Sequence, residues 1–205
     1  MLLLPVKGGI VQREELLQAL RELYLEREAW LGETFDRSIS FADAILDNRW
    51  SRAQRLGFAA GVSIYDSALV FGDVTVGEQT WIGPSVILDG TGGGIRIGAY
   101  CSIAAGVHLY THDTVLWAVS GGKAPRRKSP VEIGECCHIG AQSIILPGVK
   151  IGRRCVVAAN SLVNRAVADN TVVAGSPARV IGFVEGEGES ARLRITGSAS
   201  DPHEH

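Results

Sequence analysis

A period of six residues runs through the middle of this chain and constrains its fold more strongly than any other feature. Aliphatic residues recur at steps of six, with one shift of three residues and one longer break. Glycine follows the aliphatic residue in six of these hexads, which suits a turn where a Cβ atom would clash. A fixed short period of this kind is typical of a stacked β-helix. The 14 in-phase positions are Ile64, Val70, Val76, Ile82, Leu88, Ile97, Ile103, Leu109, Ile133, Ile139, Ile145, Ile151, Val157 and Val163.

Each hexad predicts one short strand and one corner, so three hexads close one triangular coil. Successive coils are expected to hydrogen-bond to each other at about 4.8 Å. The aliphatic residue points inward. So does the fifth residue of each hexad, which is small or β-branched at all positions except Gly92 and Asp113. Because an inward carboxylate without a partner is costly, Asp113 needs a partner, a distorted loop or exposure. The predicted fold class is mainly β, a parallel β-helix.

The cysteines follow the same register. Cys101, Cys137 and Cys155 occupy the inward fifth position of a hexad, where a small buried side chain is the expected role. Cys136 falls outside the register, and a single cysteine without a spaced partner is a weak sign of a metal site. No metal is therefore expected.

The β-helix pattern occupies only part of the chain. Leucines among Glu, Gln and Arg predict a helix over residues 12–35, and a second helix is expected around residues 40–56. We expect residues 1–58 to form an N-terminal helical cap, because an uncovered first coil would expose apolar core and strand edge. Residues 59–183 form the predicted β-helix domain, and the Gly-, Glu- and Ser-rich residues 184–205 are predicted to be unstructured.

Charge and hydropathy narrow the classes of function. The 205 residues carry a net charge of −2, which implies no general affinity for nucleic acid or an anionic membrane. The apolar run Met1–Pro5 is too short for the core of a signal peptide, and no apolar run is long enough to span a bilayer. A cytoplasmic location is expected.

Two segments break the six-residue period. The first is Asp89–Gly94, and the second spans residues 110–130 and contains the basic run Arg126–Lys128, interpreted as a solvated loop face rather than a phosphate site. A long loop in an otherwise regular solenoid is usually functional. The second break contains His112, and histidine has the unperturbed pKa nearest to working pH. His112 is therefore a candidate catalytic group.

The hexads, the segment Tyr110–Asp113 and the closing segment Ala174–Ile181 resemble the hexapeptide-repeat acyltransferases. Among these, the chain is most similar to the sugar O-acetyltransferases of the maltose and galactoside type, and to relatives that modify bacterial surface polysaccharides. The resemblance implies a left-handed β-helix, a homotrimer with active sites between subunits, and acetyl-CoA as the donor. The usual N-terminal sugar-binding region of the family has no clear match in residues 1–58.

The resemblance also implies catalytic roles. His112 matches the histidine that acts as general base on the acceptor. Asp113, its neighbour in sequence, and Asp89, expected one coil away from the His112 loop, are candidates for orienting the imidazole, although Asp89 also suits a turn before glycine. Tyr110 and Trp117 are candidates for stacking against a sugar or for packing.

On the donor side, the resemblance implies contacts along the later coils. The pantetheine arm of acetyl-CoA is expected to bond to backbone groups near Ala141 and Ala159. Asn164 and Arg165 follow in the family's contact segment. Arg179, in the closing segment, is expected to meet the phosphates, because a guanidinium group binds phosphate well.

The sequence therefore predicts an acetyl-CoA-dependent O-acetyltransferase acting on a sugar or a surface-polysaccharide precursor. One alternative is an N-acetyltransferase of an amino sugar on a nucleotide carrier. Two others are a zinc hydratase of the carbonic-anhydrase type, which would need His108, His112 and His138 to converge between subunits, and a scaffold without activity.

Overall fold

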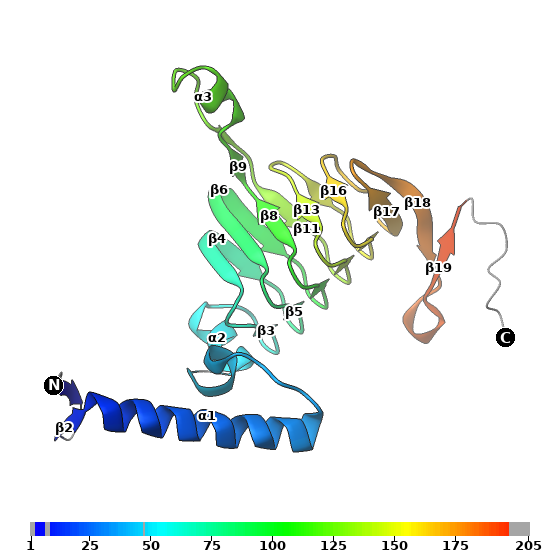
Figure 1. The fold of residues 1–205 in the computed structure, drawn as a ribbon. Coiled ribbons are helices and arrows are strands. Elements are labelled where there is room, and N and C mark those ends of the chain that lie inside the picture. The colour runs from blue at the N-terminus through cyan, green and yellow to red at the C-terminus, as the bar shows by residue number, and fades with distance from the viewer. Residues whose placement is uncertain (1–2, 7–8, 47, 197–205) are drawn as a thin grey trace. The chain divides into compact units, whose positions relative to one another are not determined.

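The structure, a computed structural model, describes residues 3–6, 9–46 and 48–196. The chain divides into two compact units, Met1–Asn48 and Arg49–His205. Figure 1 shows the helices and strands of both units. None of the helices within the described ranges is long and apolar enough to cross a membrane.

The first unit is built around one long helix. Strands β1 (Leu3–Val6) and β2 (Gly9–Gln12) pair antiparallel and lead into α1 (Arg13–Phe35). The short helix η1 (Ala42–Leu46) follows. The Tyr24 hydroxyl of α1 donates a hydrogen bond to the Ile39 carbonyl at 3.1 Å, and the Tyr24 ring lies 5.6 Å from that of Phe41. These contacts fold the segment after α1 back onto the helix.

The second unit is a parallel β-helix with three faces, as the hexads predict (Figure 1). Face A consists of β3 (Ser63–Ile64), β5 (Trp81–Ile82), β7 (Ser102–Ile103), β12 (His138–Ile139), β15 (Val156–Val157) and β17 (Thr171–Gly175). Face B consists of the first halves of β4 (Leu69–Val76) and β6 (Ile87–Ile97), then β8 (His108–Tyr110), β13 (Ile144–Ile145) and β16 (Leu162–Val163). Face C consists of the second halves of β4 and β6, then β11 (Val131–Ile133), β14 (Lys150–Ile151) and a bridge at Val167.

The core is the column of inward side chains that the period predicts. Thirteen of the 14 aliphatic hexad positions are buried, and the remaining one, Val70, is partly buried against them. The three inward cysteines are buried and Cys136 is exposed. Each buried thiol donates to a carbonyl one coil further on, as Cys101 does to Gly134 at 3.1 Å and Cys137 to Gly152 at 3.0 Å. Stacked inward side chains therefore hold the coils in register.

Helix α2 (Arg49–Arg55) lies against the first coil of the β-helix. Its Ala53 is buried in the core. The Arg52 guanidinium donates hydrogen bonds to the carbonyls of Tyr65 and Ala68, so it satisfies acceptors of the first coil that no preceding coil can reach. The helix expected around residues 40–56 is thus divided between η1 and α2, and the cap expected over residues 1–58 as a whole stays a prediction.

The C-terminal end differs from the sequence-based expectation. Strand β18 (Ala178–Glu185) pairs antiparallel with β17, and β19 (Arg192–Ile195) pairs antiparallel with β18 after the turn η2 (Gly188–Ser190). The expectation that the chain is unstructured from residue 184 is therefore wrong for residues 184–195. Arg192 and Arg194 both contact the Glu185 carboxylate across this hairpin. Residues 197–205 lie outside the described residues.

Candidate active site

The two breaks in the period stack on each other at one corner of the β-helix. Asp89, in β6, is the strand partner of Tyr110, in β8. The Thr111 hydroxyl donates to the Asp89 carbonyl at 2.6 Å and accepts from the Gly92 amide at 2.8 Å. A Cβ atom on Gly92 would lie 2.2 Å from the Thr111 carbonyl oxygen, so only glycine fits there. The corner Asp89–Gly94 therefore supports the start of the second break.

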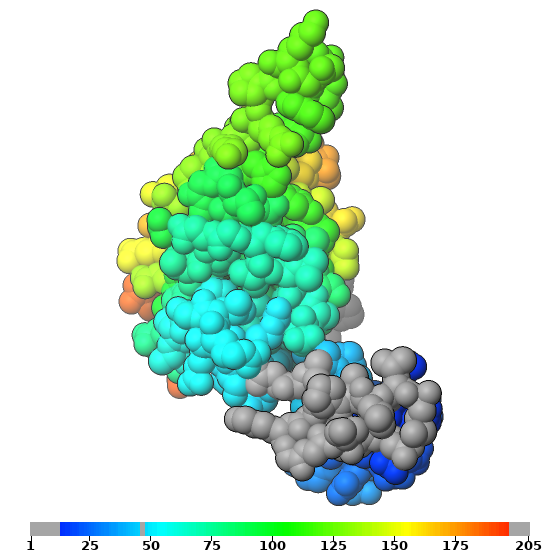
Figure 2. Space-filling model, turned by 90° about the vertical axis from the view of Figure 1, so that its left-hand side faces the viewer, coloured from blue at the N-terminus to red at the C-terminus, as the bar shows by residue number. Residues whose placement is uncertain are grey.

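The second break, residues 110–130, forms an arm that projects from the β-helix (Figures 1 and 2). Strands β9 (His112–Asp113) and β10 (Arg127–Lys128) pair antiparallel at its base, and α3 (Val115–Val119) lies at its tip. The Ser129 amide donates to the Thr111 carbonyl at 2.8 Å. Arg127 donates to the Pro147 carbonyl of the next coil at 3.4 Å. These bonds fix the base of the arm against the β-helix.

His112, Thr91 and Asp89 meet at the base of the arm. The Nδ1 atom of His112 lies 3.2 Å from the Thr91 hydroxyl oxygen and 3.6 Å from Oδ2 of Asp89. The Thr91 hydroxyl also lies 2.6 Å from Oδ1 of Asp89. The side chains of His112 and Asp89 are 29% and 15% exposed. Asp89 therefore lies beneath His112, where the sequence places it.

The hydrogen bonds within this triad define the tautomer of the imidazole. A threonine hydroxyl has one proton to donate, and the Thr91 hydroxyl donates it in the short hydrogen bond to Asp89. The hydroxyl must then accept the second bond, so Nδ1 of His112 carries the proton. The opposite nitrogen, Nε2, is left with a free lone pair in the neutral imidazole. This is the arrangement that a general base needs.

Asp113 does not occupy the inward position that the hexad register assigns to it. The chain leaves the coil at Thr111, which is fully buried, so the register ends before residue 113. The Asp113 carboxylate accepts from the Val115 amide at 3.1 Å, and Arg127 is its strand partner. Because adjacent strand residues point to opposite sides, Asp113 faces away from His112.

The two aromatic candidates lie apart. The Tyr110 hydroxyl is 3.3 Å from Nδ1 of His108, and the two rings meet edge to face at 5.8 Å. Trp117 belongs to α3 and is 42% exposed, with the guanidinium carbon of Arg126 5.6 Å from its ring centroid. Tyr110 therefore packs on face B, whereas Trp117 and Arg126 form an open surface on the arm.

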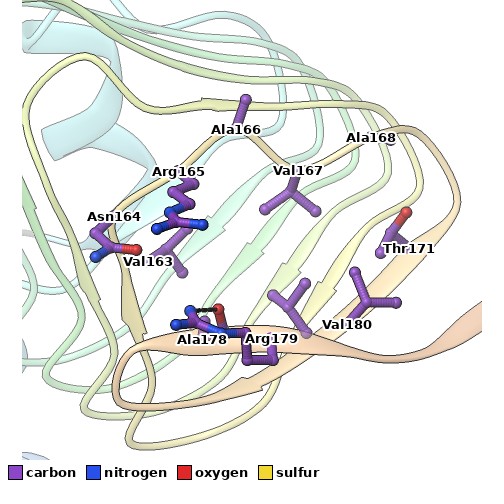
Figure 3. A pocket seen from close by; sticks show the side chains of 11 residues that line it. Val163, Asn164, Arg165, Ala166, Val167, Ala168, Thr171, Ala178, Arg179 and Val180 are labelled. Carbon is purple, nitrogen blue, oxygen red and sulfur yellow. Dashed lines mark hydrogen bonds between the residues drawn. The ribbon is translucent and has the colours of Figure 1, made fainter.

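Three of the expected donor-binding residues share one pocket of about 300 Å³ beside the last coil. Figure 3 shows Asn164, Arg165 and Arg179 gathered at one side of it. Neither arginine has a carboxylate partner among the residues that the structure describes; Arg179 donates to the Ala178 carbonyl at 2.9 Å. The apolar remainder of the lining is formed by Val163, Ala166, Val167, Ala168, Val173, Ala178 and Val180. The pocket therefore offers two uncompensated guanidinium groups beside an apolar wall.

A second groove, of about 430 Å³ along face C, has a different electrostatic character. Lys150 lies 2.8 Å from Glu132, and the hydrogen bond from Lys150 lowers the pKa of the Glu132 carboxyl. Arg153 likewise lies 3.4 Å from Asp169. Because these charges are already paired, this groove is a weaker site for an anionic ligand than the Arg165–Arg179 pocket.

His112 and the Arg165–Arg179 pocket lie along the same edge of the β-helix. His112 follows β8 and Asn164 follows β16, at the same corner two coils apart, or about 10 Å along the axis. Ala141 and Ala159 stack at the corner before face B, where the Asn160 amide donates to the Ala141 carbonyl at 2.8 Å. Face B thus lies between the two groups of donor-binding candidates.

Thr91 belongs to the site although no sequence motif pointed to it. The sequence Asp89-Gly90-Thr91 at the start of the first break could have indicated it, because Asp and Ser/Thr side chains commonly bond to nearby groups in turns. The amide and hydroxyl of Thr91 both donate to Oδ1 of Asp89, at 3.1 and 2.6 Å.

The histidines needed for a zinc hydratase do not converge within the chain. His108 is half-buried on face B, His112 lies on the arm and His138 is exposed on face A. Within the described ranges, no group of three or more His, Cys, Asp or Glu side chains is arranged to hold a metal ion.

Comparison with known proteins agrees with this fold. A family described as bacterial transferase hexapeptide (six repeats) matches residues 130–165, and one described as hexapeptide repeat of succinyl-transferase matches residues 73–111. The resemblance to the hexapeptide-repeat acyltransferases is therefore confirmed.

Individual relatives match parts of the chain. A 2,3,4,5-tetrahydropyridine-2,6-dicarboxylate N-acetyltransferase of Clostridium perfringens is 46% identical over 67 residues, which are 33% of this chain and 28% of that protein. A putative colanic acid biosynthesis acetyltransferase of Escherichia coli K12 is 34% identical over 112 residues, 53% of this chain and 57% of that protein. The chain thus spans less than two thirds of the length of these curated relatives.

Among solved structures, a hexapeptide-repeat-containing acetyltransferase of Vibrio cholerae is similar over most of the chain. It has 29% sequence identity and a TM-score of 0.58, covering 83% of this chain and 91% of that chain. A complex of the Vibrio cholerae protein with acetyl-CoA has 26% identity and a TM-score of 0.55, covering 85% and 92%.

The triad predicts that neutral His112 carries its proton on Nδ1. Long-range ¹H–¹⁵N NMR of the imidazole should therefore show an unprotonated Nε2. Thr91→Val removes the hydroxyl and should shift the population toward the Nε2–H form, whereas Thr114→Val, further along the arm, should not. An Nε2–H tautomer in the unaltered protein would contradict the triad.

Proposed function

We propose that this protein is an acetyl-CoA-dependent O-acetyltransferase whose acceptor is a sugar or a surface-polysaccharide precursor. The observation that carries the proposal is the His112–Thr91–Asp89 triad at the base of the arm. This triad leaves the Nε2 lone pair of His112 available at a partly exposed corner of a hexapeptide-repeat fold. The resemblance to sugar O-acetyltransferases supports the choice of acceptor.

In the proposed reaction, Nε2 of His112 takes the proton of the acceptor hydroxyl as the hydroxyl oxygen attacks the carbonyl carbon of the thioester. The carbon–sulfur bond then breaks, and the sulfur leaves with the bonding electron pair and takes the proton from the imidazolium. Asp89, through Thr91, stabilises the positive charge on the imidazole in between. His112 returns to its starting form, and the acetyl ester and free CoA are the products.

The donor is proposed to bind along the edge that leads from His112 to the Arg165–Arg179 pocket. The two unpaired guanidinium groups suit the phosphates of the CoA nucleotide, and Asn164 adds amide donors beside them. Ala141 and Ala159 stack at the opposite corner of face B, where their small side chains suit the proposed contact with the pantetheine arm of a donor bound to a neighbouring subunit. The acetyl-CoA complex of the similar Vibrio cholerae protein supports this choice of donor.

N-acetylation of an amino sugar is the second candidate. It is favoured by the 46% identity to an N-acetyltransferase over 67 residues, and a neutral His112 serves an amine acceptor equally well. Mass spectrometry of products from matched hydroxyl and amino acceptors distinguishes the two: an alkali-labile ester supports O-acetylation, and a stable amide supports N-acetylation.

A homotrimer is proposed from the different outer surfaces of the faces. The outward residues of face B form a largely apolar row across its strands: Leu69, Ile87, His108, Ile144 and Leu162. Those of face C are polar or charged: Thr75, Arg96, Glu132 and Lys150. An apolar row on a regular sheet suits burial against another copy. Since face B adjoins the His112 edge, a neighbouring subunit would complete the site.

His112→Ala should lower kcat by about 10²–10⁴-fold, because it removes the general base. Acetyl-CoA affinity, measured by calorimetry, should stay unchanged, because the imidazole is not part of the Arg165–Arg179 pocket. Asp113→Asn, which changes the carboxylate on the opposite side of β9, is the matched control and should keep turnover close to wild type. Wild-type turnover in His112→Ala would overturn the assignment.

Arg179→Ala should weaken acetyl-CoA binding by roughly 1.5–3 kcal/mol through loss of a charge-assisted phosphate contact. Titration calorimetry with acetyl-CoA and with its 3′-dephospho form identifies the phosphate: a loss confined to acetyl-CoA assigns the 3′-phosphate. Arg153→Ala, whose guanidinium is already paired with Asp169, should leave both affinities unchanged. Equal losses on both donors would assign Arg179 to the 5′-diphosphate that both carry, and unchanged affinity for both would contradict the phosphate contact.

Ile144→Glu should dissociate the assembly, because it places a charge in the apolar row of face B. Analytical ultracentrifugation should give three times 21.8 kDa for the unaltered protein and a lower mass for the variant. Thr75→Glu on face C should keep the larger mass. A monomeric, active wild-type protein at micromolar concentration would contradict the proposed trimer.

A further inference from the structure

The arm carries a charge opposite to that of the chain as a whole. Residues 110–130 contain four basic side chains, Lys123, Arg126, Arg127 and Lys128, and one acidic side chain, Asp113. The arm therefore has a formal charge of +3 in a chain whose net charge is −2. A concentration of one sign of charge beside a candidate active site attracts ligands of the opposite sign.

The strand register divides these charges between the two sides of the arm. Asp113 and Arg127 are strand partners on one side, and Arg127 also donates to the Pro147 carbonyl. Arg127 therefore has a structural role. Lys128 is the strand partner of His112. Directly opposite residues of an antiparallel pair have Cβ atoms about 5 Å apart on the same side, so the Lys128 ammonium group belongs to the side of the arm that presents His112.

Lys128 and Arg126 are available to a ligand. Both are exposed, and neither makes an ion pair with any residue that the structure describes. Arg126 lies over the half-exposed Trp117 ring, at 5.6 Å, so the arm combines an apolar stacking surface with a cation. A ring that stacks on Trp117 while an anionic group meets a cation is the kind of contact that a charged sugar makes.

We propose that the acceptor is a negatively charged sugar, and that Lys128 selects it by binding its carboxylate or phosphate while a hydroxyl of the same glycan lies at Nε2 of His112. This proposal rests on the proposed acetyl transfer and adds the class of acceptor. Arg126 and Trp117 hold the neighbouring part of the glycan. An ammonium group serves as a compact point charge for either anion. The proposed donor phosphates have their own guanidinium groups in the Arg165–Arg179 pocket, two coils further along the edge.

The test compares three disaccharides that differ only in the group at C6 of the terminal sugar: a uronate, its carboxyl-reduced neutral counterpart, and the 6-phosphate of that counterpart. Binding of each is measured by titration calorimetry with CoA bound, and kcat/KM is measured with saturating acetyl-CoA. The unaltered protein should prefer at least one charged disaccharide by about tenfold or more. The uronate and phosphate results identify which anion is recognised.

Lys128→Gln should remove this preference, lowering affinity and kcat/KM for the charged disaccharide by about 10- to 100-fold. The neutral disaccharide and the KM for acetyl-CoA should not change. Lys123→Gln is the matched control, because it removes the same charge from the arm away from the β9–β10 pair. Lys128→Arg should retain most of the preference, which separates a charge effect from a structural one.

Several results would overturn the inference. One is equal use of charged and neutral disaccharides by the unaltered protein, and another is an equal loss on all three in Lys128→Gln. A rise in the KM for acetyl-CoA alone would assign Lys128 to the donor. If a charged disaccharide binds in a Lys128-dependent manner but is never acetylated, the charge recognition stands and the proposed reaction fails. If only neutral sugars are acetylated, the reaction stands and the recognition fails.

Discussion

The stacking of inward aliphatic side chains, coil on coil, is the constraint on which the rest of the structure depends. Each buried residue fixes the height and rotation of its coil, so an insertion cannot enter a strand without turning its side chains outward. Extra residues leave the coil at a corner instead. Two such corners occur on adjacent coils at the same edge, and this places Asp89 and Thr91 beneath His112.

The same regularity distributes charge around the molecule. On face C, neighbouring coils present opposite charges that pair, as Glu132 and Lys150 do at 2.8 Å. At the edge shared by His112 and Asn164, the cations of the arm and of the Arg165–Arg179 pocket have no such partners among the residues that the structure describes. Exposed charge pairs contribute little to stability, whereas unpaired cations beside a candidate base attract an anionic donor and an anionic acceptor.

The period predicted the core and the relation between the two breaks, because both follow from counting residues along a repeating coil. Counting also placed Asp113 inward, which is wrong, since the register ends where Thr111 enters its buried position and the chain leaves the coil. Thr91 and the C-terminal hairpin were missed for a different reason. Thr91 is placed by its side-chain contact with Asp89, and the hairpin is placed by antiparallel backbone pairing with β17; a hydrophobic period contains neither.

The tip of the arm connects the proposed assembly to the proposed chemistry. Helix α3 has five residues, too few for a stable isolated helix, and its Val115, Leu116 and Val119 are each at least 60% exposed. Hydrogen bonds made by Thr111, Ser129 and Arg127 hold the base of the arm, but none of these bonds involves the tip. In the proposed trimer, burial of these apolar side chains against a neighbouring subunit would fix the tip. It would also fix Trp117 and Arg126, so acceptor binding would depend on the presence of the neighbour.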